Sequence, residues 1–356
     1  MEEKLLAPNS PLLRAKTLIF VRLDGLGDSL LATPCIAHLK EQCPHLKVVV
    51  VASPLGAPVF RDLAEVVIVD PKSEDCPQEI YQTIIENKAD IVISFTEKRY
   101  VFQAMKRANS TFRVGFTPGI GQPLKSLELL WELNHRVDGR VNCHEVERFF
   151  LLLEELGLKR PSVIPQLTFH PNSKEVREAR EKFLQITNDT EKKICAIQLM
   201  PRWHIDLSNN ANDKTSEQLQ NNLQVVSYLY KKLREKDIMP VFTCAPNDRM
   251  WAERFLSTLE EAKLFVSDNI GLFVAFLQNC HLFVTPDGGS AHLCACAKTP
   301  QIVIFSRDFS KSESIEYRST RWHPWGSPYK IVADPGKNTA YRWQDDLLNA
   351  CLEQIF

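Results

Sequence analysis

The residues that decide the fold are Thr17–Ser29, which read TLIFVRLDGLGDS. Residues 17–21 form a short apolar run rich in β-formers, which is typical of a buried parallel strand. A polar, glycine-containing turn follows at 22–29, and a helix is expected over residues 29–42. A strand that passes through a glycine turn into a helix is the opening unit of a parallel α/β sheet.

The same alternation of strands and helices continues through both halves of the chain. In the first half, further strands are predicted at 47–51, 66–69 and 91–95. A periodic helix at 144–156 and a proline-containing linker at 159–166 then interrupt the pattern. The alternation restarts in the second half, where strands are predicted at 194–199, 239–244, 264–266, 282–285 and 301–305.

This pattern predicts an α/β protein made of two Rossmann-like, doubly wound domains. The N-terminal domain is expected at 1–165 and the C-terminal domain at 166–335. A C-terminal helix within 336–356 could pack back on the N-terminal domain.

Composition favours a soluble globular protein. Hydrophobic residues make up 44% and charged residues 24%, which excludes wholesale disorder. The net charge of −1 excludes a global basic field for nucleic acid. No apolar run reaches the ~18 residues of a membrane span, and no signal peptide is predicted at residues 1–14. The ten cysteines contain no Cys-x-x-Cys pair, which predicts reduced, mostly buried thiols and no metal site. A cytoplasmic location is expected.

Two turns have the position of a ligand site, because doubly wound sheets bind ligands at strand carboxyl ends and helix N-termini. The first is Asp24–Asp28. It contains Gly-x-Gly, but Leu30 replaces the third glycine of a dinucleotide fingerprint. The second strand of that fingerprint ends in an acid that binds the ribose, whereas this chain has Ala52, Ser53 and Pro54 there. A nicotinamide oxidoreductase is therefore disfavoured, and Asp28 is interpreted either as a helix cap or as a functional carboxylate.

The second turn is residues 285–292, which read TPDGGSAH. Here a strand leads directly into a glycine pair and then a helix, a geometry that offers backbone N–H groups and a positive helix end to a diphosphate. His292 would lie in the first turn of the helix, where it could donate to a phosphate or merely satisfy the local backbone. Asp287 could likewise be a turn residue or a cap.

These two turns carry a resemblance to glycosyltransferase family 9, whose best-known members are ADP-heptose:lipopolysaccharide heptosyltransferases. Residues 21–34 (VRLDGLGDSLLATP) resemble the opening motif of the family. Residues 284–293 (VTPDGGSAHL) resemble its second signature, Asp-Ser/Thr-Gly-x-x-His-Leu. Weaker similarity lies at 113–116 and 144–149. The two motifs stand about 260 residues apart, one in each predicted domain, so the resemblance covers most of the chain.

The resemblance implies a GT-B fold, in which an acceptor-binding N-terminal domain and a nucleotide-sugar-binding C-terminal domain face each other across a cleft. It also implies that Asp28 is the general base that takes the proton of the acceptor hydroxyl. Asp287, Gly288, Gly289 and His292 are implied to surround the sugar and diphosphate of the donor. No metal and no cofactor is implied, because helix termini and basic side chains stabilise the departing diphosphate.

The chain departs from the family pattern at two places. The family usually has a Lys-x-Trp element after the first strand of the C-terminal domain, whereas this chain has residues 200–204 (MPRWH) and a polar stretch. Either Lys214 or Arg202 could supply the phosphate-binding charge, and we favour Lys214. Gly288 replaces the usual Ser or Thr, which leaves the identity of the donor sugar open.

Basic residues follow the strand predicted at 91–95 in the acceptor half. They are Lys98, Arg99, Lys106, Arg107 and Arg113. They form either a solvated helix face or contacts to the anionic Kdo carboxylates and phosphates of a lipopolysaccharide core. Lys98 and Arg99 are the candidate acceptor ligands. The aromatic stretch Arg321–Gly326 could stack on a sugar or pack at the domain interface.

The sequence and the resemblance together predict an inverting, metal-independent glycosyltransferase that transfers a heptose from ADP-heptose to a lipopolysaccharide-core acceptor. Its partners would be a nucleotide sugar and a glycolipid or oligosaccharide acceptor, without nucleic acid. Peripheral association with the cytoplasmic face of the inner membrane is compatible with this function. One alternative is the same fold with another nucleotide sugar or a non-lipopolysaccharide acceptor. A second is a catalytically silent sugar-nucleotide-binding protein, against which the presence of Asp28 and His292 argues.

Overall fold

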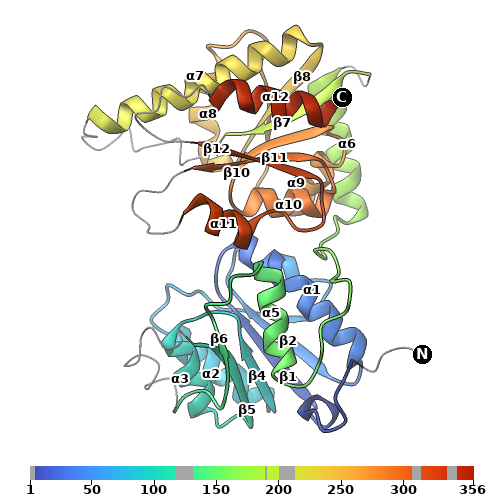
Figure 1. Ribbon diagram of the computed structural model, residues 1–356, viewed down its shortest axis with the longest axis vertical. Coiled ribbons are helices and arrows are strands. Elements are labelled where there is room, and N and C mark those ends of the chain that lie inside the picture. Colours follow the sequence, from blue (N-terminus) through green and yellow to red (C-terminus); the bar gives the residue numbers. More distant parts are fainter. Residues whose placement is uncertain (1–4, 118–130, 189–190, 200–212, 307–313, 335–342) are drawn as a thin grey trace. The chain divides into compact units, whose positions relative to one another are not determined.

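The computed structural model describes residues 5–117, 131–188, 191–199, 213–306, 314–334 and 343–356, with the backbone alone at 213–223, 306 and 334. The chain divides into two compact units, Met1–Phe169 and His170–Phe356 (Figure 1). The boundary lies four residues beyond the one expected from the sequence. No helix within the described residues is long and apolar enough to cross a membrane.

The first unit is built on a six-stranded parallel sheet. Its strands are β1 (Thr17–Arg22), β2 (Lys47–Ala52), β3 (Glu65–Ile68), β4 (Ile91–Ser94), β5 (Phe112–Thr117) and β6 (His135–Asp138), in the order β3-β2-β1-β4-β5-β6. Its helices are α1 (Leu26–Gln42), α2 (Cys76–Glu86), α3 (Arg99–Arg107) and α5 (Glu145–Glu154), with 3-10 turns η1 (Pro11–Leu13) and η2 (Ala57–Phe60).

Helices cover both faces of this sheet because successive strand residues alternate between the faces. Ile19 and Val21 of β1 pack in the apolar cluster that includes α2 and α3. Phe20, between them, faces the opposite way and stacks on Phe95 at a centroid distance of 5.0 Å. Phe95 in turn contacts Phe149 of α5 at 4.6 Å. The central strand is therefore buried on both faces, as its continuous apolar run predicts.

The second unit repeats this architecture. Its strands are β7 (Lys193–Gln198), β8 (Ile238–Cys244), β9 (Lys263–Val266), β10 (Leu282–Pro286), β11 (Gln301–Ser306) and β12 (Tyr329–Asp334), all parallel, in the order β12-β11-β10-β7-β8-β9. Its helices are α6 (Ser173–Thr187), α7 (Asp213–Glu235), α8 (Arg249–Leu256), α9 (Ile270–Leu277), α10 (Gly289–Ala297), α11 (Ile315–Trp322) and α12 (Trp343–Ile355), with the 3-10 turn η4 (Pro246–Asp248).

The strand order is the same in both units. Numbered within its own unit, each sheet runs 3-2-1-4-5-6, which is the doubly wound Rossmann order. The predicted pair of Rossmann-like domains is therefore confirmed. In this order the connections reverse direction between the first and fourth strands, and ligands bind outside the carboxyl ends of those two strands. Ligands are therefore expected at the ends of β1 and β4 in the first unit and of β7 and β10 in the second.

The C-terminal helix corrects one expectation. The sequence suggested that residues 336–356 could return to the N-terminal domain. In the structure, Leu347, Ala350 and Cys351 of α12 are buried in the apolar core of the second unit, with residues of β10, β11 and α7. These buried positions recur three to four residues apart, so they give α12 one apolar stripe, and the second unit covers that stripe.

Candidate functional site

In the first unit, polar side chains gather where β1 and β4 end. Asp24 and Asp28 follow β1, and Thr96 follows β4, which pairs with β1 in the register Val21 to Ser94. The helix after β1 begins at Leu26, three residues earlier than expected, with Gly25 as its N-cap and no side-chain capping bond. Asp28 is thus the third helical residue and not the N-cap, and its carboxylate accepts a hydrogen bond from the backbone N–H of Gly25 at the N-cap.

Arg22 joins the two aspartates of this turn. It is the last residue of β1, and its side chain is only 4% exposed. Its Nη2 lies 3.0 Å from Oδ1 of Asp28, and its Nη1 lies 3.2 Å from Oδ2 of Asp24. Nη1 also donates to the carbonyl oxygen of Phe95 at 2.9 Å. The guanidinium therefore holds both carboxylates against the end of β4.

Asp24 is fixed from its other side by Thr96. The Thr96 hydroxyl donates to Oδ2 of Asp24 at 2.6 Å and accepts the backbone N–H of Leu23 at 2.9 Å. Asp28 is less constrained: 39% of its side chain is exposed, against 32% for Asp24, and besides Arg22 it accepts a hydrogen bond from the Gly25 amide. A bound molecule can reach both carboxylates, and Asp28 is the one without a bound hydroxyl group.

The surroundings of Asp28 raise the pKa of its carboxyl. Burial of the group is the largest cause, and the negative charges of Asp24 and Glu145 add to it. The positive charge of Arg22 and the Gly25 amide act in the opposite direction. A reachable carboxylate with a raised pKa at a topological switch point is a candidate general base.

A second buried arginine stands beside this group. Arg148 of α5 is 3% exposed, pairs with Glu145 at 2.9 Å and also pairs with Glu97 after β4. Its guanidinium lies 3.7 Å from the ring centroid of Phe116. Arg148 lies in the region of weaker family similarity at 144–149, but the sequence analysis did not predict a function for it.

The candidate acceptor ligands fall at the N-terminus of α3. Lys98 is exposed at the N-cap position, three residues after Phe95, and pairs with no acid among the described residues. Arg99 is exposed as well but lies 3.6 Å from the buried carboxylate of Glu132. Arg107 stacks on Tyr81 at 4.1 Å, so this member of the basic group packs against the protein. Lys98 is the member best placed to meet a ligand.

In the second unit, β10 leads through a glycine N-cap into α10. Gly288 has φ 152° and ψ −166°, a conformation that only glycine adopts readily. A Cβ at this position would meet nothing within 4 Å, so the backbone dihedral and not crowding requires glycine. The N-cap residue of α10 is Gly288, which has no side chain with which to cap the helix. A helix N-terminus that opens on glycine suits an anion site.

Asp287 is held by a residue that the sequence did not indicate. Arg318 of α11 forms an ion pair with its carboxylate, and the two side chains are 7% and 18% exposed. The guanidinium also lies 5.7 Å from the ring centroid of Phe305 in β11. Asp287 is consequently fixed in the tertiary structure and is more than a turn residue.

His292 is buried on the inner side of α10. Its imidazole is 3% exposed, and its Nδ1 has no hydrogen-bond partner within the described part of the chain. Burial and the nearby His323 lower its pKa to about 4. His292 is thus neutral near pH 7 and can offer a ligand a hydrogen bond but not a charge. His323 stacks on Tyr329 at 5.1 Å, so the aromatic stretch 321–326 packs within the second unit.

The charge expected from Lys214 or Arg202 stays a prediction. Arg202 lies outside the described residues. Lys214 falls in the first turn of α7, and its side chain lies outside the described part.

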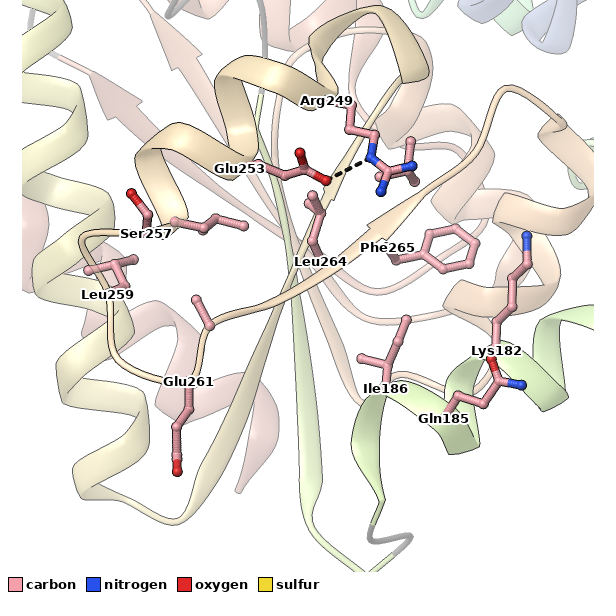
Figure 2. Close-up of a pocket in the computed structure, with 13 residues that line it drawn as sticks. Lys182, Gln185, Ile186, Arg249, Glu253, Ser257, Leu259, Glu261, Leu264 and Phe265 are labelled. Carbon is pink, nitrogen blue, oxygen red and sulfur yellow. Dashed lines mark hydrogen bonds and ion pairs between the residues drawn. The ribbon is translucent and has the colours of Figure 1, made fainter.

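The hollow shown in Figure 2 lies elsewhere in the second unit. It has a volume of about 540 Å³ and is bordered by α6, α8 and the edge strand β9. Two of its charged residues, Arg249 and Glu253, pair with each other at 2.7 Å. None of its lining residues belongs to β10 or α10. It is therefore separate from the Asp287–His292 turn.

Comparison with known proteins finds a family model that matches the part of the chain containing the second turn. Residues 222–339 match the model of glycosyltransferase family 9 (heptosyltransferase), and this range includes Asp287, Gly288 and His292. A Haemophilus influenzae protein named "Putative glycosyltransferase" is 24% identical over 336 residues, which cover 89% of this chain and 88% of the relative.

Solved structures show the same fold. A family 9 glycosyltransferase from Veillonella parvula is 14% identical, with a TM-score of 0.74 and 99% of both chains covered. Escherichia coli ADP-heptose LPS heptosyltransferase II is 14% identical, with a TM-score of 0.68 over 95% of this chain and 98% of that one. E. coli heptosyltransferase WaaC with ADP is 15% identical, with a TM-score of 0.66 over 95% and 99%. The expected GT-B fold is confirmed.

Proposed function

We propose that this chain is a family 9 glycosyltransferase that transfers a heptose from ADP-heptose to a lipopolysaccharide-core acceptor, with inversion and without a metal. The match at 222–339 supports the family, and the fold is that of the heptosyltransferases. The observation that carries the reaction type is Asp28, a reachable carboxylate with a raised pKa at the switch point of the first unit.

In the proposed reaction the acceptor hydroxyl attacks the anomeric carbon of the donor. Asp28 takes the hydroxyl proton as the new C–O bond forms and the bond from the anomeric carbon to the phosphate oxygen breaks. The nucleoside diphosphate leaves with the electron pair of that bond. Direct attack from the side opposite the leaving group inverts the anomeric configuration.

The second unit is proposed to bind the donor at the N-terminus of α10. Backbone N–H groups after Gly288 and the positive helix end would stabilise the diphosphate. Asp287, held by Arg318, would accept hydrogen bonds from sugar hydroxyls. His292 is neutral near pH 7 and would donate or accept one hydrogen bond. Gly289 contributes backbone only, and Lys214 is proposed to supply the remaining positive charge.

The identity of the donor rests on two related structures. WaaC of E. coli was solved with ADP and with ADP-2-deoxy-2-fluoro heptose, at 15% and 17% identity to this chain. The same general fold also occurs in a UDP-GlcNAc 2-epimerase of Methanocaldococcus jannaschii, with a TM-score of 0.54. Fold alone therefore leaves ADP and UDP sugars as alternatives, and the family match at 222–339 favours ADP-heptose.

On the acceptor side, Lys98 and Arg99 are proposed to meet the anionic groups of a lipopolysaccharide core. Lys98 is the stronger candidate, because Arg99 is engaged by Glu132. The enzyme would act in the cytoplasm, at or near the inner membrane, and would not need nucleic acid. The alternative is a different acceptor with the same charge.

Binding of the donor nucleotide can be tested by thermal shift with ADP, UDP and GDP. Ligand at 100 times its Kd stabilises the folded protein by about 2.7 kcal/mol. ADP should raise the melting temperature most, and EDTA should leave this shift unchanged. A larger shift with UDP would move the proposal to another nucleotide sugar. A strict requirement for magnesium or manganese would contradict the metal-free reaction.

The Asp28→Asn variant tests the base. Asn has nearly the same shape, and its side-chain oxygen can still accept the hydrogen bond from the Gly25 amide, so the start of the helix should survive. Asn cannot take a proton, so turnover should fall by about 10²–10⁴-fold while donor affinity stays unchanged. The measurement is release of nucleoside diphosphate with a purified core acceptor. Asp138→Asn, at the exposed end of β6, is the matched control and should keep wild-type turnover. Retained turnover in Asp28→Asn would refute the assignment.

A further inference from the structure

Two buried arginines and four carboxylates form one group at the end of β1 and β4. Arg22 pairs with Asp24 and Asp28, and Arg148 pairs with Glu145 and Glu97. When all six side chains are ionised, the acids exceed the arginines by two charges. Glu145 connects the two halves, because its charge raises the pKa of Asp28. The excess negative charge favours uptake of one proton by this group.

Arg22 cannot leave this group. Its side chain is 4% exposed, and its guanidinium lies 5.0 Å from the ring centroid of Phe149. Nη1 is bound to the carbonyl of Phe95, and Nε is buried without a partner among the described residues. Because these contacts fix the guanidinium, Arg22 can pair with Asp24 and Asp28 only where the two carboxylates now lie.

The two aspartates are not equivalent. Asp24 is held by Arg22 and by the hydroxyl of Thr96. Asp28 is slightly more exposed, at 39% against 32% for Asp24, and the charged groups that act on it come from three elements: Arg22 from β1, Asp24 from the turn and Glu145 from α5. Because Oδ2 of Asp24 is already engaged by both Arg22 and Thr96, Asp28 is the carboxylate that would receive a proton from a bound hydroxyl.

We propose that Arg22 is the positioning residue of Asp28 and that Asp24 is the second acid that keeps Arg22 paired while Asp28 carries the proton. This inference rests on the proposed function, in which Asp28 is the base. The acceptor O–H bond breaks, its proton passes to a carboxylate oxygen of Asp28, and Asp28 becomes neutral. Without Asp24, that step would leave a buried guanidinium without a counter-charge, which is costly. The proton then leaves to water through the exposed side of Asp28.

The pKa of Asp28 itself tests the arrangement without any substrate. It is measured on the full-length protein by ¹³C carboxyl titration, with the Asp28 signal assigned from the Asp28→Asn spectrum. Arg22→Gln should raise the pKa of Asp28 by about 1–3, because a nearby positive charge is lost. Asp24→Asn should lower it, because a nearby negative charge is lost. A merely structural role would not move the pKa in opposite directions.

Two further variants keep the test decisive. Arg22→Lys retains the charge and should hold the pKa of Asp28 closer to the wild-type value than Arg22→Gln does. Arg107→Gln removes an arginine of α3 that does not act on Asp28 and should leave its pKa unchanged. If Arg22→Gln does not fold, Asp24→Asn and Arg22→Lys decide the question. An Asp28 pKa that does not fall in Asp24→Asn overturns the inference.

Turnover separates this inference from the proposed function. In Arg22→Lys the acid limb of the turnover profile should follow the pKa of Asp28 measured by titration, because the base works only when ionised. An acid limb that does not follow the measured pKa overturns the inference even when Asp28→Asn abolishes turnover. Retained turnover in Asp28→Asn instead refutes the proposed function, whatever the titrations show.

Discussion

Replacing His292 with leucine should remove a pH dependence from the stability of the second unit. In the folded protein the pKa of His292 is lowered from 6.5 to about 4, mainly by burial. In the unfolded chain the same imidazole takes a proton near pH 6.5. Between these two values the unfolded state binds more protons than the folded state, so stability falls as the pH falls. Below about pH 4 both states are protonated and this loss ends.

The size of the effect follows from the gap between the two pKa values. A gap of about 2.5 pH units, at about 1.4 kcal/mol each, corresponds to about 3 kcal/mol in full. About 2 kcal/mol of this should already be lost between pH 7 and pH 5. Leucine has a similar volume and no titrating group. Because Nδ1 of His292 is buried without a partner among the described residues, its removal should cost little at pH 7.

Urea unfolding at pH 7, 6 and 5 measures the difference. Five of the six tryptophans belong to the second unit, so their fluorescence reports mainly on its unfolding. The wild type should lose about 2 kcal/mol more than His292→Leu over this range. Other groups that titrate in both proteins cancel in this comparison. Equal pH dependence in the two proteins would refute the burial argument, as would an imidazole that titrates near 6.5 by NMR.

The remaining predictions concern the turn before α10. Gly288→Ala should destabilise the second unit by about 1–3 kcal/mol in urea unfolding, because alanine disfavours the observed dihedrals. Gly25→Ala, at φ −69°, is the control, and an equal loss there would show that the dihedral is not the cause. Arg318→Gln should cost about 3 kcal/mol by removing this cation from the partly buried Asp287. Adding Asp287→Asn should recover part of this, and strict additivity of the two losses would contradict the ion pair.

The central strands were predictable because burial on both faces demands apolar residues throughout. β1 and β2, for example, appear in the sequence as near-continuous runs of valine, isoleucine and leucine. The strands β5, β6 and β12 were not predicted, although the edge strands β3 and β9 were. β6 reads HRVD and exposes alternate residues, since an edge strand has one neighbour and a face open to solvent. The start of α1 was misplaced because Gly25 caps it without a side-chain signal.

Site residues were predictable only where they lie in one short motif of consecutive residues. Asp28 and the turn at 287–292 each follow a strand and open a helix, so the sequence located them. Arg318 was missed because it meets Asp287 from 31 residues away, through a helix that the sequence did not indicate. Arg148 lies on a predicted helix, but its partner Glu97 is 51 residues away in the sequence. Such partners are set by tertiary packing, which a local pattern does not contain.

The repeated strand order bears on how the specificity of this protein can evolve. The switch point between the first and fourth strands carries different groups in the two units. In the first unit it carries carboxylates around Arg22, and in the second it carries backbone N–H donors after Gly288. Each slot is built from its own strands and its own core. Under the proposed function, a new acceptor can be acquired by altering residues 1–169 alone, and a new donor by altering 170–356. Donor specificity and acceptor specificity can then evolve independently of each other.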